Sequence, residues 1–126
     1  MPSQIARHRH SSFVNQSGRC FYCGHPMWES DISTFAESHK LSLRQARIYR
    51  CTAEHLVAKI DGGSNSAKNI VAACHWCNKN RHARKKAPTP IEYMEFIKKR
   101  LAQGRWLNDS PALASQRLVN PIPSRT

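Results

Sequence analysis

Two Cys-x-x-Cys pairs constrain what this chain can fold into more than any other feature of its sequence. The first pair encloses Phe21 and Tyr22, and the second encloses His75 and Trp76. Four thiolates form the tetrahedral set of soft ligands that a closed structural Zn²⁺ site requires, and two pairs predict such a site far more strongly than one pair does. The expected zinc ligands are Cys20, Cys23, Cys74 and Cys77.

The length of the chain makes a structural metal ion useful. With 126 residues, of which 40% are hydrophobic, the sequence predicts one small domain with extensions and a thin apolar core. A structural zinc site contributes roughly 10–16 kcal/mol of apparent binding free energy, more than a small core nets after the loss of chain entropy. We therefore expect removal of the metal to unfold much of the protein.

The charge balance indicates the kind of partner. Twenty Lys and Arg residues against eight Asp and Glu residues give a formal net charge of +12. A field of that sign favours a polyanionic partner, most simply nucleic acid, although a basic protein without a specific partner has the same composition. A membrane partner is disfavoured because the basic residues do not form one amphipathic stripe, and no apolar run approaches the length of a membrane span.

The cysteines also bear on the compartment. No apolar signal-peptide core follows Met1, and the first twelve residues are polar and basic. Paired Cys-x-x-Cys spacing in such a chain is typical of metal binding in a reducing cytoplasm rather than of a secreted disulfide framework. The fifth cysteine, Cys51, is expected to be a small half-buried hydrophobic residue rather than a further ligand or a reactive thiol.

The segment between the two pairs predicts a strand, a loop, a second strand and a helix. The first strand is expected within residues 48–57, and it carries the dipeptide Glu54-His55. A glycine-rich loop follows over 58–68, and a short return strand follows at 70–73. The second cysteine pair then opens a helix over 74–86, which the prolines beyond it stop.

Further helices are expected on both sides of this unit. Residues 31–49 have helical periodicity with Asp31 or Ser30 as a cap, and Ser42 offers a second start, so two short helices are an alternative. Residues 89–103 predict one more helix, with Thr89 as its cap. The expected fold class is therefore α+β.

The chain divides into four expected parts. Residues 1–12 predict a flexible basic arm, and residues 13–87 predict the zinc-stapled domain. Residues 88–107 predict a C-terminal helix that packs on the domain. Residues 108–126, which are rich in Pro and Ser, predict a loosely ordered tail.

A run of polar residues between the cysteine pairs resembles the HNH endonucleases. The matching run is Glu54-His55-Leu56-Val57-Ala58-Lys59, Gly62-Gly63-Ser64 and Asn69-Ile70-Val71-Ala72-Ala73-Cys74-His75-Trp76-Cys77-Asn78. The resemblance implies a small ββα-metal fold, also called a His-Me finger, with the zinc-binding cysteines as a staple. It further implies hydrolysis of DNA phosphodiester bonds with one divalent metal ion.

The resemblance and the chemistry together imply residue roles. Hydrolysis needs a base for the attacking water, and His55 suits that task because the unperturbed pKa of histidine is about 6.5. Glu54 and Asn78 offer hard oxygen ligands that suit Mg²⁺ or Mn²⁺. By resemblance, Asn69 pins the loop and orients the histidine. His82 follows Asn78 by one helical turn, so it could be a further metal ligand, a phosphate contact or an exposed helix residue.

Two questions stay open at this point. Neighbouring side chains of a strand point to opposite faces, so Glu54 and His55 converge only if the strand ends or bulges there. The basic residues after Asn78 are expected either to contact DNA phosphates or to form a solvated helix end. They are Arg81, Arg84, Lys85 and Lys86.

Two other functions compete with the nuclease. A non-catalytic zinc-knuckle protein would bind nucleic acid without needing Glu54, His55 and Asn78 together. A redox protein would use the Cys-x-x-Cys thiols, but both pairs lack the βαβ surroundings of thioredoxin-like proteins. The combination of residues favours the endonuclease.

Overall fold

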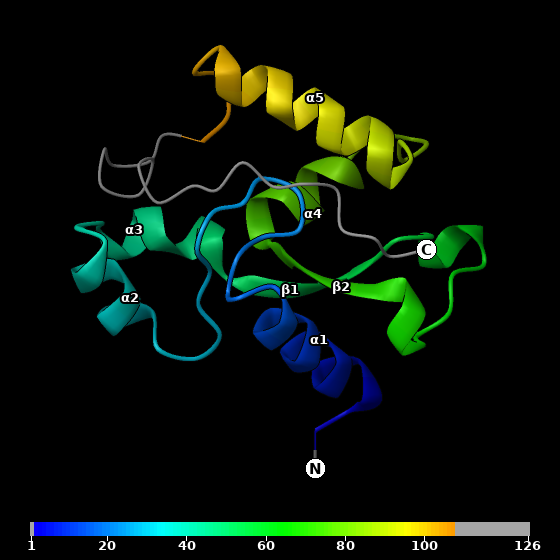
Figure 1. Ribbon diagram of the computed structural model, residues 1–126, viewed down its shortest axis with the longest axis horizontal. Coiled ribbons are helices and arrows are strands. Elements are labelled where there is room, and N and C mark those ends of the chain that lie inside the picture. The colour runs from blue at the N-terminus through cyan, green and yellow to red at the C-terminus, as the bar shows by residue number, and fades with distance from the viewer. Residues whose placement is uncertain (1, 108–126) are drawn as a thin grey trace.

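A β-hairpin followed directly by a helix forms the centre of the molecule. The computed structural model describes residues 2–107. Strands β1 (Cys51–His55) and β2 (Ile70–Cys74) pair antiparallel, with Cys51 opposite Cys74 and His55 opposite Ile70. Helix α4 (His75–Arg81) begins where β2 ends (Figure 1). The fold is α+β with a ββα core, as the sequence predicts.

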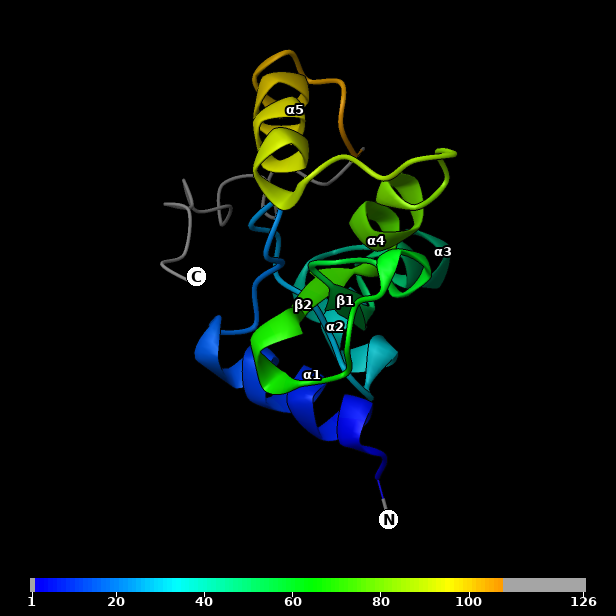
Figure 2. The same ribbon diagram turned by 90° about the vertical axis from the view of Figure 1, so that its right-hand side faces the viewer.

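Helices cover both faces of the hairpin. Helix α1 (Gln4–Asn15) lies on one face, and α4 followed by α5 (Pro90–Ala102) lies on the other (Figures 1 and 2). Every residue of β2 is buried, because this strand is covered from both sides. The main apolar cluster joins the first cysteine turn, β2 and α5.

The N-terminal segment corrects the expectation of a flexible arm over residues 1–12. Ser3 begins α1, and its side chain accepts a hydrogen bond from the backbone N–H of Ala6 at 3.1 Å. The helix then packs against both strands. Residues 2–12 therefore belong to the folded unit.

Polar side chains attach α1 to β2. The Ser12 hydroxyl donates to the carbonyl of Ile70 at 3.1 Å. The Gln16 side chain, just after the helix, donates to the Ala72 carbonyl at 2.8 Å and accepts from the Ala72 N–H at 2.9 Å. These bonds satisfy backbone groups of β2 that β1 does not pair, which explains why a mostly polar segment is ordered.

Residues 31–49 form short helices rather than one long helix. Asp31 caps α2 (Ile32–Ser38), and Ser42 begins α3 (Leu43–Ala46) with a reciprocal capping box. A 3₁₀ turn (Arg47–Tyr49) leads into β1. A second, smaller apolar cluster holds these pieces together, and its buried members are Phe35, Ala36, Leu41, Ala46 and Tyr49.

The C-terminal helix forms where the sequence predicts it. Thr89 and Glu92 make a reciprocal capping box at the start of α5, and Pro90 occupies its first turn. The buried face consists of Tyr93, Met94 and Ile97. No helix within residues 2–107 is long and apolar enough to cross a bilayer. The expected tail lies outside the described residues.

Candidate active site

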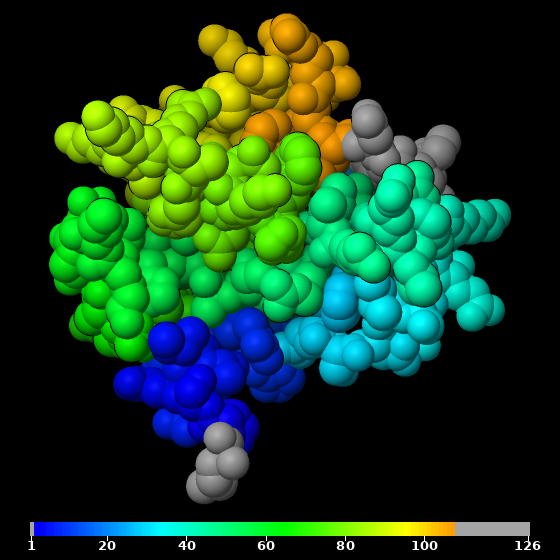
Figure 3. Space-filling model, turned by 180° about the vertical axis from the view of Figure 1, so that it is seen from behind, coloured from blue at the N-terminus to red at the C-terminus, as the bar shows by residue number. Residues whose placement is uncertain are grey.

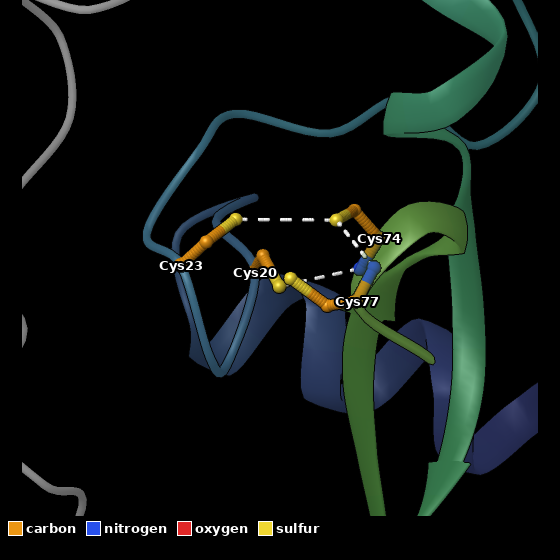
Figure 4. A group of neighbouring side chains, drawn as sticks. All are labelled: Cys20, Cys23, Cys74 and Cys77. Atoms are coloured by element: carbon orange, nitrogen blue, oxygen red, sulfur yellow. Dashed lines mark hydrogen bonds between the residues drawn. The ribbon is translucent and has the colours of Figure 1, made fainter. Parts of the chain in front are cut away.

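The four cysteines of the two pairs converge on one point (Figure 4). Their sulfur atoms all lie within 4.8 Å of one another, and all four residues are buried. Cys20 and Cys23 come from the turn before α2, Cys74 ends β2, and Cys77 lies in the first turn of α4. The cluster is positioned to bind a metal ion such as zinc, as the sequence predicts.

The distances and the backbone around the cluster fit a thiolate-bound ion. The Sγ atoms of Cys23 and Cys74 are 3.9 Å apart. A tetrahedral zinc site with bonds of about 2.3 Å places its sulfurs roughly 3.8 Å apart, whereas a disulfide needs about 2.05 Å. Cys20 Sγ accepts hydrogen bonds from the backbone N–H groups of Tyr22 at 3.4 Å and Cys74 at 3.3 Å.

Burial and hydrogen bonding shift the pKa values of three thiols in the cluster, those of Cys20, Cys23 and Cys77. Burial raises the pKa of the Cys20 thiol, but hydrogen bonds from the neighbouring cysteines outweigh it and hold the pKa well below the usual value. Burial raises the pKa values of Cys23 and Cys77 well above it. Thiolates at these distances repel one another, so all four ionise together only when a cation compensates their charge.

Cys51 lies outside the cluster. It is buried in β1, and burial raises the pKa of its thiol to about 12. Such a thiol carries almost no thiolate at neutral pH and behaves as a small apolar group. The expectation of a hydrophobic role is confirmed.

Asn69 clamps the loop between β1 and β2. Its Oδ1 accepts from the Val57 N–H at 2.8 Å, and its Nδ2 donates to the carbonyls of Val57 at 3.0 Å and Ser64 at 2.8 Å. At Gly63 a Cβ atom would lie 1.7 Å from the Val57 carbonyl oxygen and 2.9 Å from Asn69 Nδ2. Only glycine allows this close approach, so the Gly-Gly pair and the asparagine form one loop structure.

The end of β1 resolves the question of how Glu54 and His55 can serve one site. Glu54 is buried, His55 is half-buried, and β1 ends at His55. Arg81 donates to the carbonyls of His55 and Leu56, both at 2.9 Å, which holds the chain where it leaves the strand. An open pocket of about 320 Å³ is lined by Ala53, Glu54, His55, Ala58, Lys59, Ile60, Asn78 and His82.

Glu54 is held from three sides. Its carboxylate is 1% exposed. Oε2 accepts from the Tyr22 hydroxyl at 2.9 Å and from Arg81 Nη1 at 3.1 Å, whereas Oε1 lies 2.8 Å from His82 Nε2. Burial, and then the negative charge of Glu54, raise the pKa of Tyr22 far above its usual value, so its hydroxyl stays protonated and donates.

Asn78 is oriented by the strand beside it. Its Nδ2 donates to Thr52 Oγ1 at 3.0 Å and to the Ala53 carbonyl at 3.1 Å. The Thr52 hydroxyl already donates to the Ala73 carbonyl at 2.6 Å, so it acts as an acceptor toward Asn78. The amide nitrogen is therefore fixed on the strand, and Oδ1 is left for the pocket.

Three side chains that line the pocket carry atoms able to bind a metal ion. Glu54 Oε1 and Asn78 Oδ1 are hard donors, and His82 adds an imidazole nitrogen. His82 Nε2 and Glu54 Oε1 are 2.8 Å apart, a hydrogen bond in which the imidazole N–H donates to the carboxylate. This donor set fits a divalent ion such as Mg²⁺ or Mn²⁺. His82 lines the pocket and stays partly exposed there, so both a metal ligand and a phosphate contact remain open to it.

His55 has a partner that the sequence did not identify. Its Nε2 lies 2.9 Å from Asn65 Oδ1. An amide oxygen can only accept, so Nε2 carries a proton, and in the neutral ring Nδ1 keeps its lone pair. Asn69, which was expected to pin the loop and orient the histidine, bonds to Val57 and Ser64 of the loop that carries Asn65. Its position after Gly-Gly-Ser marks Asn65 as a loop residue but does not identify His55 as its partner.

A family comparison agrees with this geometry. The model of the family described as HNH endonuclease matches residues 20–84, just over half of the 126 residues. The chain belongs to the HNH endonuclease family. Comparisons with curated proteins and with solved structures gave no match. The matched segment contains the cysteine cluster and the pocket, and it implies a nuclease-type function on a nucleic-acid substrate.

Within this HNH domain, Arg81 does not have the expected role. Its guanidinium is 3% exposed. Besides its contacts with Glu54 and the end of β1, it donates from Nε at 3.0 Å and from Nη2 at 2.9 Å to the carbonyl of Pro88. Because a buried guanidinium with these partners cannot reach a phosphate, the predicted nucleic-acid contact at Arg81 is wrong.

The other basic residues of this group lie after α4 and not on it, because the helix ends at Arg81, five residues before its expected end at 86. Arg84, Lys85 and Lys86 are exposed in the segment that leads to α5. Figure 3 shows this segment and the β1–β2 loop, in yellow-green and green, as neighbours on one face of the HNH domain. These three residues remain candidates for phosphate contact.

Proposed function

We propose that this protein is a metal-dependent endonuclease that hydrolyses DNA phosphodiester bonds. In this proposal the cysteine cluster holds a structural zinc ion, and the open pocket holds Mg²⁺ or Mn²⁺. The observation that supports it most is the meeting of His55 with Glu54, Asn78 and His82 around one pocket. The thiols must stay reduced to bind zinc, so we also propose that the protein works in the cytoplasm.

In the proposed mechanism His55 is the general base. Asn65 holds the proton on Nε2, so Nδ1 can accept the proton of the attacking water. The divalent ion would be held by Glu54, Asn78 and His82. A bound ion would polarise the phosphoryl oxygen and stabilise the leaving oxygen. Arg81 holds the Glu54 carboxylate and the end of β1 in place while His55 acts as the base.

A plasmid-cleavage assay with Mg²⁺ and with Mn²⁺ tests this proposal. The His55→Ala protein should cleave roughly 10²–10⁴-fold more slowly than the parent, because that is the usual contribution of a positioned base. Its melting temperature, zinc content and DNA affinity should remain, since His55 is half-buried and lies outside the cysteine cluster and the apolar core.

His8→Ala is the matched control, because His8 lies on α1 and not in the pocket. It should cleave at the parental rate. Equal cleavage by the His55→Ala protein and the parent would show that another group is the base. A parent that binds DNA but cleaves it with neither ion would favour a non-catalytic zinc-knuckle protein that only binds nucleic acid.

A further inference from the structure

One side chain connects the cysteine cluster with the pocket. Tyr22 lies between Cys20 and Cys23, and its backbone N–H donates to Cys20 Sγ at 3.4 Å. Its hydroxyl donates to Glu54 Oε2 at 2.9 Å. The tyrosine therefore touches a ligand of the predicted zinc site at one end and a candidate ligand of the catalytic ion at the other.

The ring of Tyr22 has little freedom to move. The residue is 3% exposed, and its ring packs edge-on against Phe21 and Tyr93, with centroid distances of 5.1 and 4.9 Å. Its backbone belongs to a turn that two ligand cysteines enclose. Binding of a metal ion by those cysteines therefore also fixes the place of the tyrosine hydroxyl.

The hydroxyl acts on one particular oxygen of Glu54. Tyr22 and Arg81 together occupy Oε2, and Oε1 faces His82 in the pocket. A carboxylate held in this way can offer one oxygen to an ion and not two. One-oxygen coordination suits the octahedral geometry of Mg²⁺ and Mn²⁺, whereas Ca²⁺ often takes both oxygens of a carboxylate.

We propose that Tyr22 is a positioning residue for the catalytic ion, through which the cysteine cluster fixes the geometry of Glu54. This inference rests on the proposed function, because it requires a divalent ion in the pocket. Partners that orient a ligand from behind typically change metal affinity by about 10–100-fold, which sets the size of the expected effect.

The test measures Mn²⁺ binding to the zinc-loaded, full-length protein without DNA, by electron paramagnetic resonance of free Mn²⁺. The Tyr22→Phe protein should bind Mn²⁺ about 10–100-fold more weakly than the parent while keeping its zinc and its melting temperature. In cleavage assays it should need more Mn²⁺ for half-maximal rate, and its rate at saturating Mn²⁺ should stay near the parental value.

Tyr93→Phe is a matched control. Tyr93 is buried beside Tyr22, but its hydroxyl donates to the Cys77 carbonyl at 2.7 Å and not to Glu54. It should bind Mn²⁺ as the parent does. Parental Mn²⁺ affinity in Tyr22→Phe would overturn the inference, and so would loss of zinc or a large fall in melting temperature, because the hydroxyl would then serve the fold.

Asn78→Ala separates this inference from the proposed function. If the parent binds Mn²⁺ and the Asn78→Ala protein binds it more weakly, the pocket is a metal site, and Tyr22→Phe alone decides the role of the tyrosine. If the parent and the Asn78→Ala protein bind Mn²⁺ equally weakly, the pocket holds no ion. The proposed function then fails together with the inference.

Discussion

The cysteine cluster and the open pocket lie side by side and share α4, yet they are built in different ways. The cluster uses four identical donors, all buried, and two short turns bring them together. The pocket offers three kinds of donor side chain, a carboxylate, a carboxamide and an imidazole, and it is partly open to solvent. Its donors are held by partners from distant parts of the chain, among them Tyr22 and Arg81. Each half of the closed site is encoded by a local Cys-x-x-Cys spacing, whereas the donors of the open site depend on a second set of residues around them.

The largest effect is expected at the cysteine cluster. Because this closed site joins distant segments, a change there should cost the protein its fold and not its activity alone. Cys77→Ser removes one thiolate from a site that joins the first turn, β2 and α4. Binding of a structural zinc ion contributes roughly 10–16 kcal/mol, which is as large as the usual net stability of a domain, about 5–15 kcal/mol. Without it most of the domain should unfold. Circular dichroism and zinc analysis would measure this, and a chelator should have the same effect on the parent.

Cys51→Ala is the control for that prediction. Cys51 is equally buried but lies outside the cluster, so its replacement should keep zinc and the native spectrum. A Cys77→Ser protein that retains native circular dichroism and a cooperative melting transition would contradict the idea that the fold depends on the cluster.

Much of the fold follows from local signals in the sequence. The capping residues Asp31, Ser42 and Thr89 begin helices where they were expected, because a cap acts through neighbouring backbone groups. Gly63 and Asn69 mark the loop for a similar reason. These features need no knowledge of the rest of the molecule.

The predictions that were wrong concern segments held by contacts between residues far apart in the sequence. Residues 1–12 were expected to form an arm because they are polar and basic with few apolar anchors. Only the structure shows that Ser12 and Gln16 pair with β2. Arg81 lies in a basic run, so it was expected at the surface. Its burial depends on Glu54 and Pro88, neither of which the local pattern around Arg81 identifies.

The candidate site shows the same division. His55, Glu54 and Asn78 could be predicted because the resemblance rests on residue types at fixed spacing. Asn65 could not be assigned to His55, since their contact depends on the path of a ten-residue loop segment. The structure thus adds the residues that orient the site to those that were expected to act in it.

An intermediate effect is expected at Asn65, which tests whether the pocket depends on such partners. Asn65→Ala removes the acceptor for His55 Nε2–H, so the imidazole can adopt the other tautomer or turn. Loss of one hydrogen bond worth about 1.5 kcal/mol corresponds to roughly 10-fold slower cleavage. ¹⁵N chemical shifts of the His55 ring would show the change of tautomer directly.

Ser66→Ala is the control in the same loop, because Ser66 bonds to Ser64 and not to His55. It should keep both the parental rate and the parental tautomer. If the ¹⁵N shifts of His55 are the same in Asn65→Ala and in the parent, Asn65 does not set the protonation of the ring.

The smallest expected effect concerns the exposed basic segment beside the pocket. If the protein neutralises about six phosphates, the logarithm of its DNA affinity should fall against the logarithm of salt concentration with a slope of about −5. Lys85→Gln/Lys86→Gln should make the slope less steep by about 2, since each lost phosphate contact contributes about 0.9.

Arg44→Gln/Arg47→Gln is the control, because it makes the same change in net charge on the α3 side of the molecule, where both residues are exposed. Fluorescence anisotropy across a salt series would compare the three proteins. An equal change of slope in both double variants would mean that overall charge governs binding, and not contact beside the pocket. A shallower slope in the lysine variant with a parental slope in the arginine variant would assign Lys85 and Lys86 to the DNA surface.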